Sequence, residues 1–299
     1  MSTDAERYRE FMKRGGVADL SDRVMLTLTG ADRVRYLNGQ VTTNVQALRV
    51  GETSAACVTT AKGRLCAEIV ITASADALLI DADPKLRDTL AARLERYIVA
   101  DDVTLAEMPA ETRLLHFTGT RPSTLGERPL HAARRFGRDG WDFWTDASAL
   151  AELRPAIAAH HVALDEPLLE TLRIEAGIPR WGRELDEDTL PPEAGLERTH
   201  IDYQKGCYIG QEVISRLKSI GHVNRRLVGF VSTTGAPLTA GSAVVSPGDP
   251  GTPLGRITSV TWSFALERPI ALGYLKRSAP AGDLLADVPV AVRELPFTT

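Results

Sequence analysis

The chain has 299 residues, with 35 Lys and Arg against 39 Asp and Glu, so its formal net charge at pH 7 is −4. This length suggests about two domains with enough material for hydrophobic cores, and 43% hydrophobic with 25% charged residues excludes wholesale disorder. The weak acidity argues against a dedicated nucleic-acid binder, which usually carries a basic excess.

The first part of the chain alternates helical and strand-like patterns. Apolar spacing at i, i+3 and i+4 predicts helices, and period-2 alternation predicts strands. The predicted elements are a helix over 5–14, a strand over 24–28, a helix over 31–38, strands over 56–60 and 65–72 joined by a turn at 61–64, a strand over 78–80 and a helix over 84–98.

The alternation continues through the middle and then changes. Strands are predicted over 114–117 and 140–145, and helices over 148–160 and 166–176. After about residue 225, short strand-like runs separated by Gly and Pro turns are typical of a small antiparallel barrel. We therefore expect an α+β body over residues 1–225, with two subdomains, and an all-β module over residues 226–299.

The chain start lacks the basic-then-apolar layout of a secretory signal, and no apolar run reaches the roughly 20 residues of a spanning helix. The three cysteines, Cys57, Cys66 and Cys207, include no Cys-x-x-Cys pair. This usage indicates a reducing compartment rather than a disulfide scaffold. We expect a cytoplasmic protein that does not bind a membrane.

The densest segment for chemistry is residues 205–212, Lys-Gly-Cys-Tyr-Ile-Gly-Gln-Glu. The apolar residues Val213, Ile214 and Leu217 share one helical face, so a helix should begin near Gln211. Cys207 would then lie just before a helix N-terminus with Lys205 nearby, and both influences favour a thiolate. The alternative is a buried cysteine packed as a small hydrophobe.

A second segment surrounds Glu175. On a helix, Arg173 and Glu175 point apart. A glutamate at a helix end before Gly177 can accept two N–H groups from a planar ligand such as a pterin edge. The alternative is a solvated helix face, the usual position of a charged residue.

Two other groups of residues bear on metal binding and on anion binding. None of the six histidines has metal-ligand spacing with another His, Cys or paired carboxylate, so we expect no metal site. Arg216, Lys218, Arg225 and Arg226 form a small basic cluster near the domain junction. Such a cluster is either ordinary solvated surface or a dock for an anionic tail, because arginine binds carboxylates in a bidentate fork.

Residues 205–212 resemble the signature Lys-Gly-Cys-Tyr-x-Gly-Gln-Glu of YgfZ-type folate-binding proteins, which include mitochondrial iron–sulfur assembly factors. Further similar blocks follow the family order and span nearly the whole chain: residues 36–45, 62–64, 140–143, 172–177 and 190–194. The wider superfamily is that of the aminomethyltransferase, or T-protein, of the glycine cleavage system.

The resemblance implies a T-protein-like cloverleaf of subdomains around a folate channel, ending in a β-barrel. It implies that the cofactor is tetrahydrofolate, which can carry a polyglutamate tail. By this resemblance Glu175 would hold the pterin ring, and Arg216 with Arg225 or Arg226 would lie near the folate tail. The signature residues Lys205, Tyr208 and Gln211 are expected to contribute to the same site.

One departure from T-protein bears on activity. T-proteins carry an aspartate pair shortly after the hairpin turn, and one carboxylate acts in aminomethyl transfer. Here the corresponding stretch contains Cys66, Ala67 and Glu68. Strand alternation would place Glu68 on the same face as Cys66, where it could substitute as a base.

These features lead to three hypotheses. The first is a tetrahydrofolate-binding accessory protein that supports assembly or repair of iron–sulfur enzymes through Cys207, with iron–sulfur client or assembly proteins as partners and no direct nucleic-acid contact. The second is a folate-dependent one-carbon transferase or demethylase with Glu68 as base. The third is a scaffold whose pocket no longer binds folate. Three cysteines cannot supply the four thiolates of a stable intrachain cluster.

Overall fold

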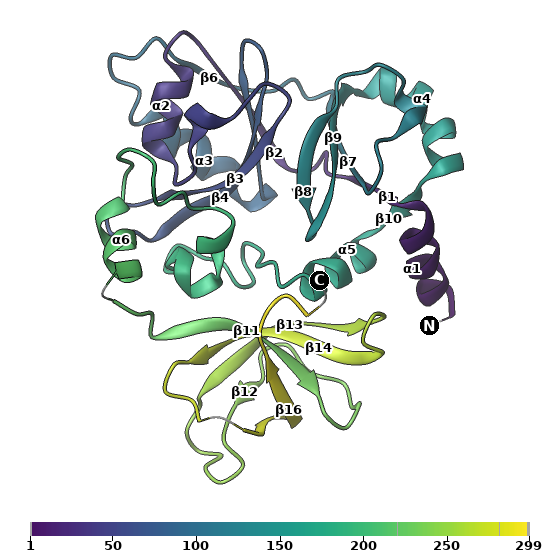
Figure 1. Ribbon diagram of the computed structural model, residues 1–299, viewed down its shortest axis with the longest axis vertical. Coiled ribbons are helices and arrows are strands. Elements are labelled where there is room, and N and C mark those ends of the chain that lie inside the picture. Colours follow the sequence, from purple (N-terminus) through teal and green to yellow (C-terminus); the bar gives the residue numbers. More distant parts are fainter. Residues whose placement is uncertain (1, 220, 281, 298–299) are drawn as a thin grey trace.

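The structure, a computed structural model, describes residues 2–219, 221–280 and 282–297. Its strands form three sheets (Figure 1). Two sheets lie side by side in the upper half of the view, and the third lies below them. The α+β body and the C-terminal antiparallel barrel expected from the sequence are confirmed.

The first sheet has the strand order β3-β4-β5-β2-β6. Its core is formed against the helices α2 and α3 by apolar side chains of alternate strand positions, such as Ile69 and Ile71. The elements are β2 (Val24–Thr29), α2 (Arg33–Gln40), η1 (Val45–Ala47), β3 (Thr53–Thr59), β4 (Leu65–Ala73), β5 (Leu78–Ala82), η2 (Pro84–Leu86), α3 (Arg87–Glu95) and β6 (Thr104–Glu107).

The second sheet has the order β10-β1-β7-β9-β8 and is antiparallel except for the parallel pair β1–β10. Asp146 begins α4 by accepting a hydrogen bond from the amide of Ala149. The elements are α1 (Ser2–Arg14), β1 (Gly16–Asp19), β7 (Thr112–Thr118), η3 (Ser123–Leu125), β8 (His131–Arg135), β9 (Arg138–Asp146), α4 (Ala147–His160) and β10 (Val162–Leu164).

The third sheet is a nearly closed antiparallel barrel in the order β12-β13-β14-β11-β16-β15. Val245 and Leu285 exchange backbone hydrogen bonds of 2.9 and 3.0 Å and so join the two edges of the sheet. Its strands are β11 (Arg225–Ser232), β12 (Ala243–Val244), β13 (Gly255–Ser263), β14 (Arg268–Lys276), β15 (Leu284–Ala286) and β16 (Val288–Arg293). The division into domains at residue 225 stays a prediction.

The segment between the second sheet and the barrel connects all three sheets. It contains α5 (Glu166–Glu175), η4 (Pro191–Ala194), η5 (Leu196–Arg198) and α6 (Gln211–Ser219). The chain end returns to it, because the amide of Phe297 donates to the carbonyl of Glu175 over 2.9 Å.

The structure differs from the sequence expectations in two ways. The helix expected over 84–98 is a 3₁₀ turn, η2, followed by the shorter α3. The strands β1, β6, β8, β10 and β15 had not been predicted. They have three to five residues each, too few for period-2 alternation to stand out from loop sequence.

A buried ionic cluster joins the first two sheets. The guanidinium of Arg135 on β8 contacts both carboxylate oxygens of Asp81 on β5 (3.1 and 2.7 Å) and both of Asp142 on β9 (2.7 to 3.0 Å). Both aspartates are fully buried, and Arg23 is a second partner of Asp81. Burial raises the pKa of Asp142, but the attraction of Arg135 outweighs it and brings the value to about 2.

We expect the substitution Arg135→Met to lower the free energy of unfolding by about 3–5 kcal/mol, because it leaves the buried carboxylate of Asp142 without its cation and Asp81 with Arg23 alone. The neighbouring Arg134 is the matched control: it is exposed and pairs with Asp139 at the surface. Arg134→Met should change stability by less than about 1 kcal/mol. Urea unfolding curves measure both, and equal effects of the two substitutions would contradict this role of Arg135.

Candidate functional site

The signature loop, residues 205–210, is anchored by its first side chain. Lys205 is 7% exposed, and its ammonium donates to the carbonyls of Asn38 (2.5 Å) and Val41 (2.7 Å) at the C-terminal end of α2. The last carbonyls of a helix lack intrahelical donors, and a cation is favourable there. Lys205 thus caps a helix distant in sequence, and burial lowers its pKa to about 8. Its charge is directed at α2.

The other end of the signature loop is fixed against α2 and the β3–β4 turn. The amide of Ile209 donates to Gly39 (3.2 Å), and its carbonyl accepts from the hydroxyl of Thr59 (2.5 Å). Gly210 has φ +89°, and a Cβ there would lie 2.5 Å from the carbonyl oxygen of Thr60. Glycine is therefore required at this position. After it α6 begins at Gln211, as predicted.

Between these anchors the signature loop exposes Cys207. An ideal Cβ on the preceding Gly206 would meet no atom within 4 Å, so the chain beside the thiol is open. Cys57 is fully buried, burial raising the pKa of its thiol, and Cys66 is partly buried. Cys207 is therefore a surface thiol, and the alternative of a cysteine packed in the core does not apply to it.

Tyr208 and Gln211 point inward from the same segment. Tyr208 is 7% exposed, its ring lies 5.2 Å from the ammonium of Lys205, and its hydroxyl is buried without a hydrogen-bond partner among the described residues. Burial raises the pKa of this hydroxyl. The amide nitrogen of Gln211 is 3.5 Å from the carbonyl oxygen of Lys205, which braces the turn.

Glu175 is buried at the junction of α5, α1 and the barrel, and is not on a solvated face. One oxygen accepts from the hydroxyl of Ser263 (2.6 Å) and the amide of Ala265 (3.3 Å), and the other from the hydroxyl of Tyr8 (3.0 Å). The side chain is 2% exposed. As predicted, Arg173 points elsewhere and binds Glu184.

Arg216 lies apart from the other two predicted arginines, Arg225 and Arg226. Arg216 is exposed on α6 and pairs with Glu212 over 2.8 Å. Arg225 pairs with Glu193 (3.0 Å) and stacks on the Tyr274 ring at 4.4 Å.

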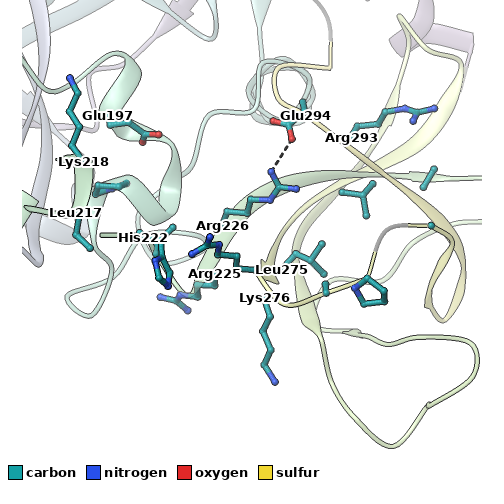
Figure 2. Close-up of a pocket in the computed structure, with 18 of the residues that line it drawn as sticks. Glu197, Leu217, Lys218, His222, Arg225, Arg226, Leu275, Lys276, Arg293 and Glu294 are labelled. Atoms are coloured by element: carbon teal, nitrogen blue, oxygen red, sulfur yellow. Dashed lines mark hydrogen bonds and ion pairs between the residues drawn. The ribbon is translucent and has the colours of Figure 1, made fainter. Parts of the chain in front are cut away.

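Arg226 pairs with Glu294 over 2.9 Å (Figure 2). Arg225 and Arg226 line a cleft of about 1090 Å³ between α6 and the barrel, which Arg216 does not line. Their roles, and those of the other residues assigned to folate, stay predictions.

The expectation that Cys66 and Glu68 share a face is wrong, because β4 contains a bulge. Val58 pairs with Ala67 and Thr59 with Leu65, so Cys66 is an extra residue in β4. Cys66 packs against the core beneath α2 and α3. Glu68, opposite Cys57, lies on the other face of the sheet.

Glu68 has a side-chain partner, His200, that the sequence did not predict. Its oxygen lies 3.2 Å from Nε2 of His200, whose Nδ1 lies 2.7 Å from the hydroxyl of Thr199. Burial raises the pKa of Glu68, but His200, Arg23 and Arg135 together bring it below the ordinary value. No sequence spacing indicated this pair, because the two residues come from β4 and from the loop before the signature.

Residues 2–219, 221–280 and 282–297 contain neither a metal-ligand cluster nor a membrane-spanning helix. No group of three or more His, Cys, Asp or Glu is placed to hold a metal ion. No helix there has the length and apolarity to cross a bilayer.

The fold is that of the glycine cleavage T-protein. The chain superposes on the aminomethyltransferase T structure from Bartonella henselae with a TM-score of 0.85, covering 98% of this chain and 89% of that one at 18% identity. Residues 225–298 match the family described as Glycine cleavage T-protein C-terminal barrel domain.

Relatives found by sequence come from two groups, the aminomethyltransferases and the proteins named YgfZ. The mitochondrial aminomethyltransferase of Gallus gallus is 27% identical over 93% of this chain and 80% of its own length. A protein of Yersinia pseudotuberculosis named tRNA-modifying protein YgfZ is 27% identical over 70% of this chain and 68% of its own. The resemblance to YgfZ-type proteins and to the T-protein superfamily is thus confirmed.

The buried ammonium of Lys205 predicts a pH dependence of stability. In the unfolded chain Lys205 keeps its proton up to its ordinary pKa of 10.5, but in the folded chain only up to about 8. The unfolded state binds more protons in this interval, so the contribution of Lys205 to stability rises with pH from about 8 to 10.5.

We therefore expect the stability of the wild type relative to Lys205→Met to increase between about pH 7.5 and 9.5 in urea titrations. Lys62→Met, at an exposed position of the β3–β4 turn, is the control and should run parallel to the wild type. A difference between the wild type and Lys205→Met that stays constant over this range would contradict the assignment.

Proposed function

We propose that this protein is a tetrahydrofolate-binding accessory protein that supports the assembly or repair of iron–sulfur enzymes through Cys207. The observation that carries the proposal is the exposed thiol on a loop that is hydrogen-bonded at both ends. Exposure gives a partner access to the sulfur, and the anchors keep it in one place. The likeness to proteins named YgfZ supports the same function.

The distribution of cysteines limits how the thiol can act. Cys57 is enclosed in the core and Cys66 packs beneath α2 and α3, so Cys207 is the exposed thiol among the three cysteines, all of which lie in the described part of the chain. A cluster needs about four ligands. Cys207 therefore acts with ligands or thiols of another protein, by transient coordination or by thiol exchange.

The residues assigned to tetrahydrofolate differ in whether their polar atoms are free to bind it. The buried hydroxyl of Tyr208 has no partner among the described residues and offers a hydrogen bond to a ligand. The oxygens of Glu175 are already engaged by three protein donors. A carboxylate accepts about four hydrogen bonds, so Glu175 can bind both N–H groups of a pterin edge only if at least one of these three donors is displaced.

The first test concerns the thiol. Because Cys207 is exposed, Cys207→Ala should keep the free energy of unfolding within about 0.5 kcal/mol of wild type and leave tetrahydrofolate affinity unchanged. It should fail to restore iron–sulfur enzyme activity in cells that lack the protein. Cys66→Ala is the control and should restore it. Full restoration by Cys207→Ala would refute the proposal.

The second test concerns Glu175 and is read by calorimetry with tetrahydrofolate. Glu175→Gln keeps the volume of the side chain, and we expect it to weaken binding by about 1.5–3 kcal/mol, the scale of a hydrogen bond to a charged group. Ser263→Ala removes one partner of the carboxylate without altering the carboxylate itself and should bind normally. Lower stability of both variants with unaltered affinity would assign Glu175 a structural role only. No saturable binding by the wild type would favour the scaffold hypothesis.

A second candidate function is one-carbon transfer, and the Glu68–His200 pair favours it. A carboxylate and an imidazole in contact can move a proton, and both side chains retain some exposure. The test is incubation with tetrahydrofolate and an aminomethyl donor. Methylenetetrahydrofolate formed at enzyme-like rates by the wild type, and abolished by Glu68→Gln or His200→Gln, would support transfer over the accessory function.

A further inference from the structure

A large basic cleft separates α6 from the barrel (Figure 2). Its volume is about 1090 Å³, at the upper end of the range for small-molecule sites. The walls come from the η4–η5 segment and the loop after it, the C-terminal end of α6, the link into β11 with its first residues, the end of β14 with the chain after it, and β16. A space of this size with walls from five segments suits an extended chain better than one small ligand.

The lining is basic in a protein that is acidic overall. Three carboxylates, Glu197, Asp283 and Glu294, face the same cleft. The six permanently cationic lining residues are Lys218, Arg225, Arg226, Lys276, Arg277 and Arg293. The cleft therefore has an excess of three positive charges, whereas the chain carries −4. Its occupant should be anionic.

Some of these cations are free to bind a ligand. Arg226 is neutralised by Glu294, and the ammonium of Lys276 uses the carbonyl of Pro253. The side chains of Arg277 and Arg293 have no hydrogen-bond or ion-pair partner among the described residues, and both are exposed. Two free guanidinium groups in one cleft are suited to bidentate contacts with carboxylates.

The lining favours a polypeptide over a nucleic acid. Single-stranded nucleic acids bind on rows of open aromatic faces. Tyr203 is the aromatic residue among the described lining residues, and the ammonium of Lys218 lies over its ring at 3.6 Å. Glu197 and Asp283 in the same lining can accept backbone N–H groups, which a peptide offers along its whole length.

The cleft and the thiol lie at opposite ends of one helix. Leu217 and Lys218, near the end of α6, line the cleft, and Cys207 precedes its first residue by four positions. Nine helical residues span about 13 Å. We propose that this cleft docks an acidic segment of the protein on which Cys207 acts, so that the docked partner also reaches the thiol. The identity of the partner as a client of Cys207 rests on the proposed function.

The test measures fluorescence anisotropy of a labelled peptide of alternating Asp and Ser, against the same peptide with Asn for Asp. We expect the full-length protein to bind the Asp peptide preferentially, and less tightly as salt rises. The double variant Arg277→Ser with Arg293→Ser should bind at least about tenfold more weakly, since each guanidinium contributes a charged hydrogen bond. Arg87→Ser, on α3, is the control and should bind like the wild type.

Three results would overturn the proposal: equal binding of both peptides, unchanged affinity of the double variant, or tighter binding of single-stranded RNA at the same arginines. Displacement of the peptide by tetrahydrofolate pentaglutamate, but not by the monoglutamate, would likewise reassign the cleft to a folate tail. Cys207→Ala should bind the peptide normally, so a failure of docking and a failure of the thiol's role are measured separately.

Discussion

The contact of Arg135 with two buried carboxylates is the constraint on which the arrangement of the body depends. Asp81 belongs to the first sheet and Asp142 to the second, and the guanidinium of Arg135 contacts both, with Arg23 as a further partner of Asp81. Once charged groups are buried they must remain paired, because separation would leave them uncompensated in the interior. The two sheets are therefore held in one relative position, and the surface of the first sheet becomes a fixed base for the signature loop.

Most residues of the signature loop make anchoring contacts, and one, Cys207, does not. Lys205 caps α2, Ile209 hydrogen-bonds to two elements, and Gly210 allows the close approach to Thr60. Cys207 takes no part in these anchors and faces solvent. Most of the motif therefore fixes the loop that carries this sulfur.

Much of the fold could be predicted from the sequence where local pattern decides structure. The start of α6 at Gln211 and the hairpin turn around Gly63 follow from an apolar stripe and a glycine. The bulge at Cys66 could not be predicted, because period-2 reasoning assumes that no residue is inserted. The partner of Glu68 and the burial of Glu175 depend on residues far away in the chain, which periodicity does not report. The position of Cys207 just before α6 could therefore be predicted, whereas the contacts around Glu68 and Glu175 could not.

Cys207 is a surface thiol on an anchored loop, whereas Cys57 is buried and Cys66 is partly buried. The decisive experiment is alkylation of the native protein with iodoacetamide, followed by peptide mass spectrometry over time. We expect Cys207 to be modified first, Cys66 to follow slowly, and Cys57 to react only after unfolding in urea. Modification of Cys207 no faster than that of Cys57 would contradict this expectation.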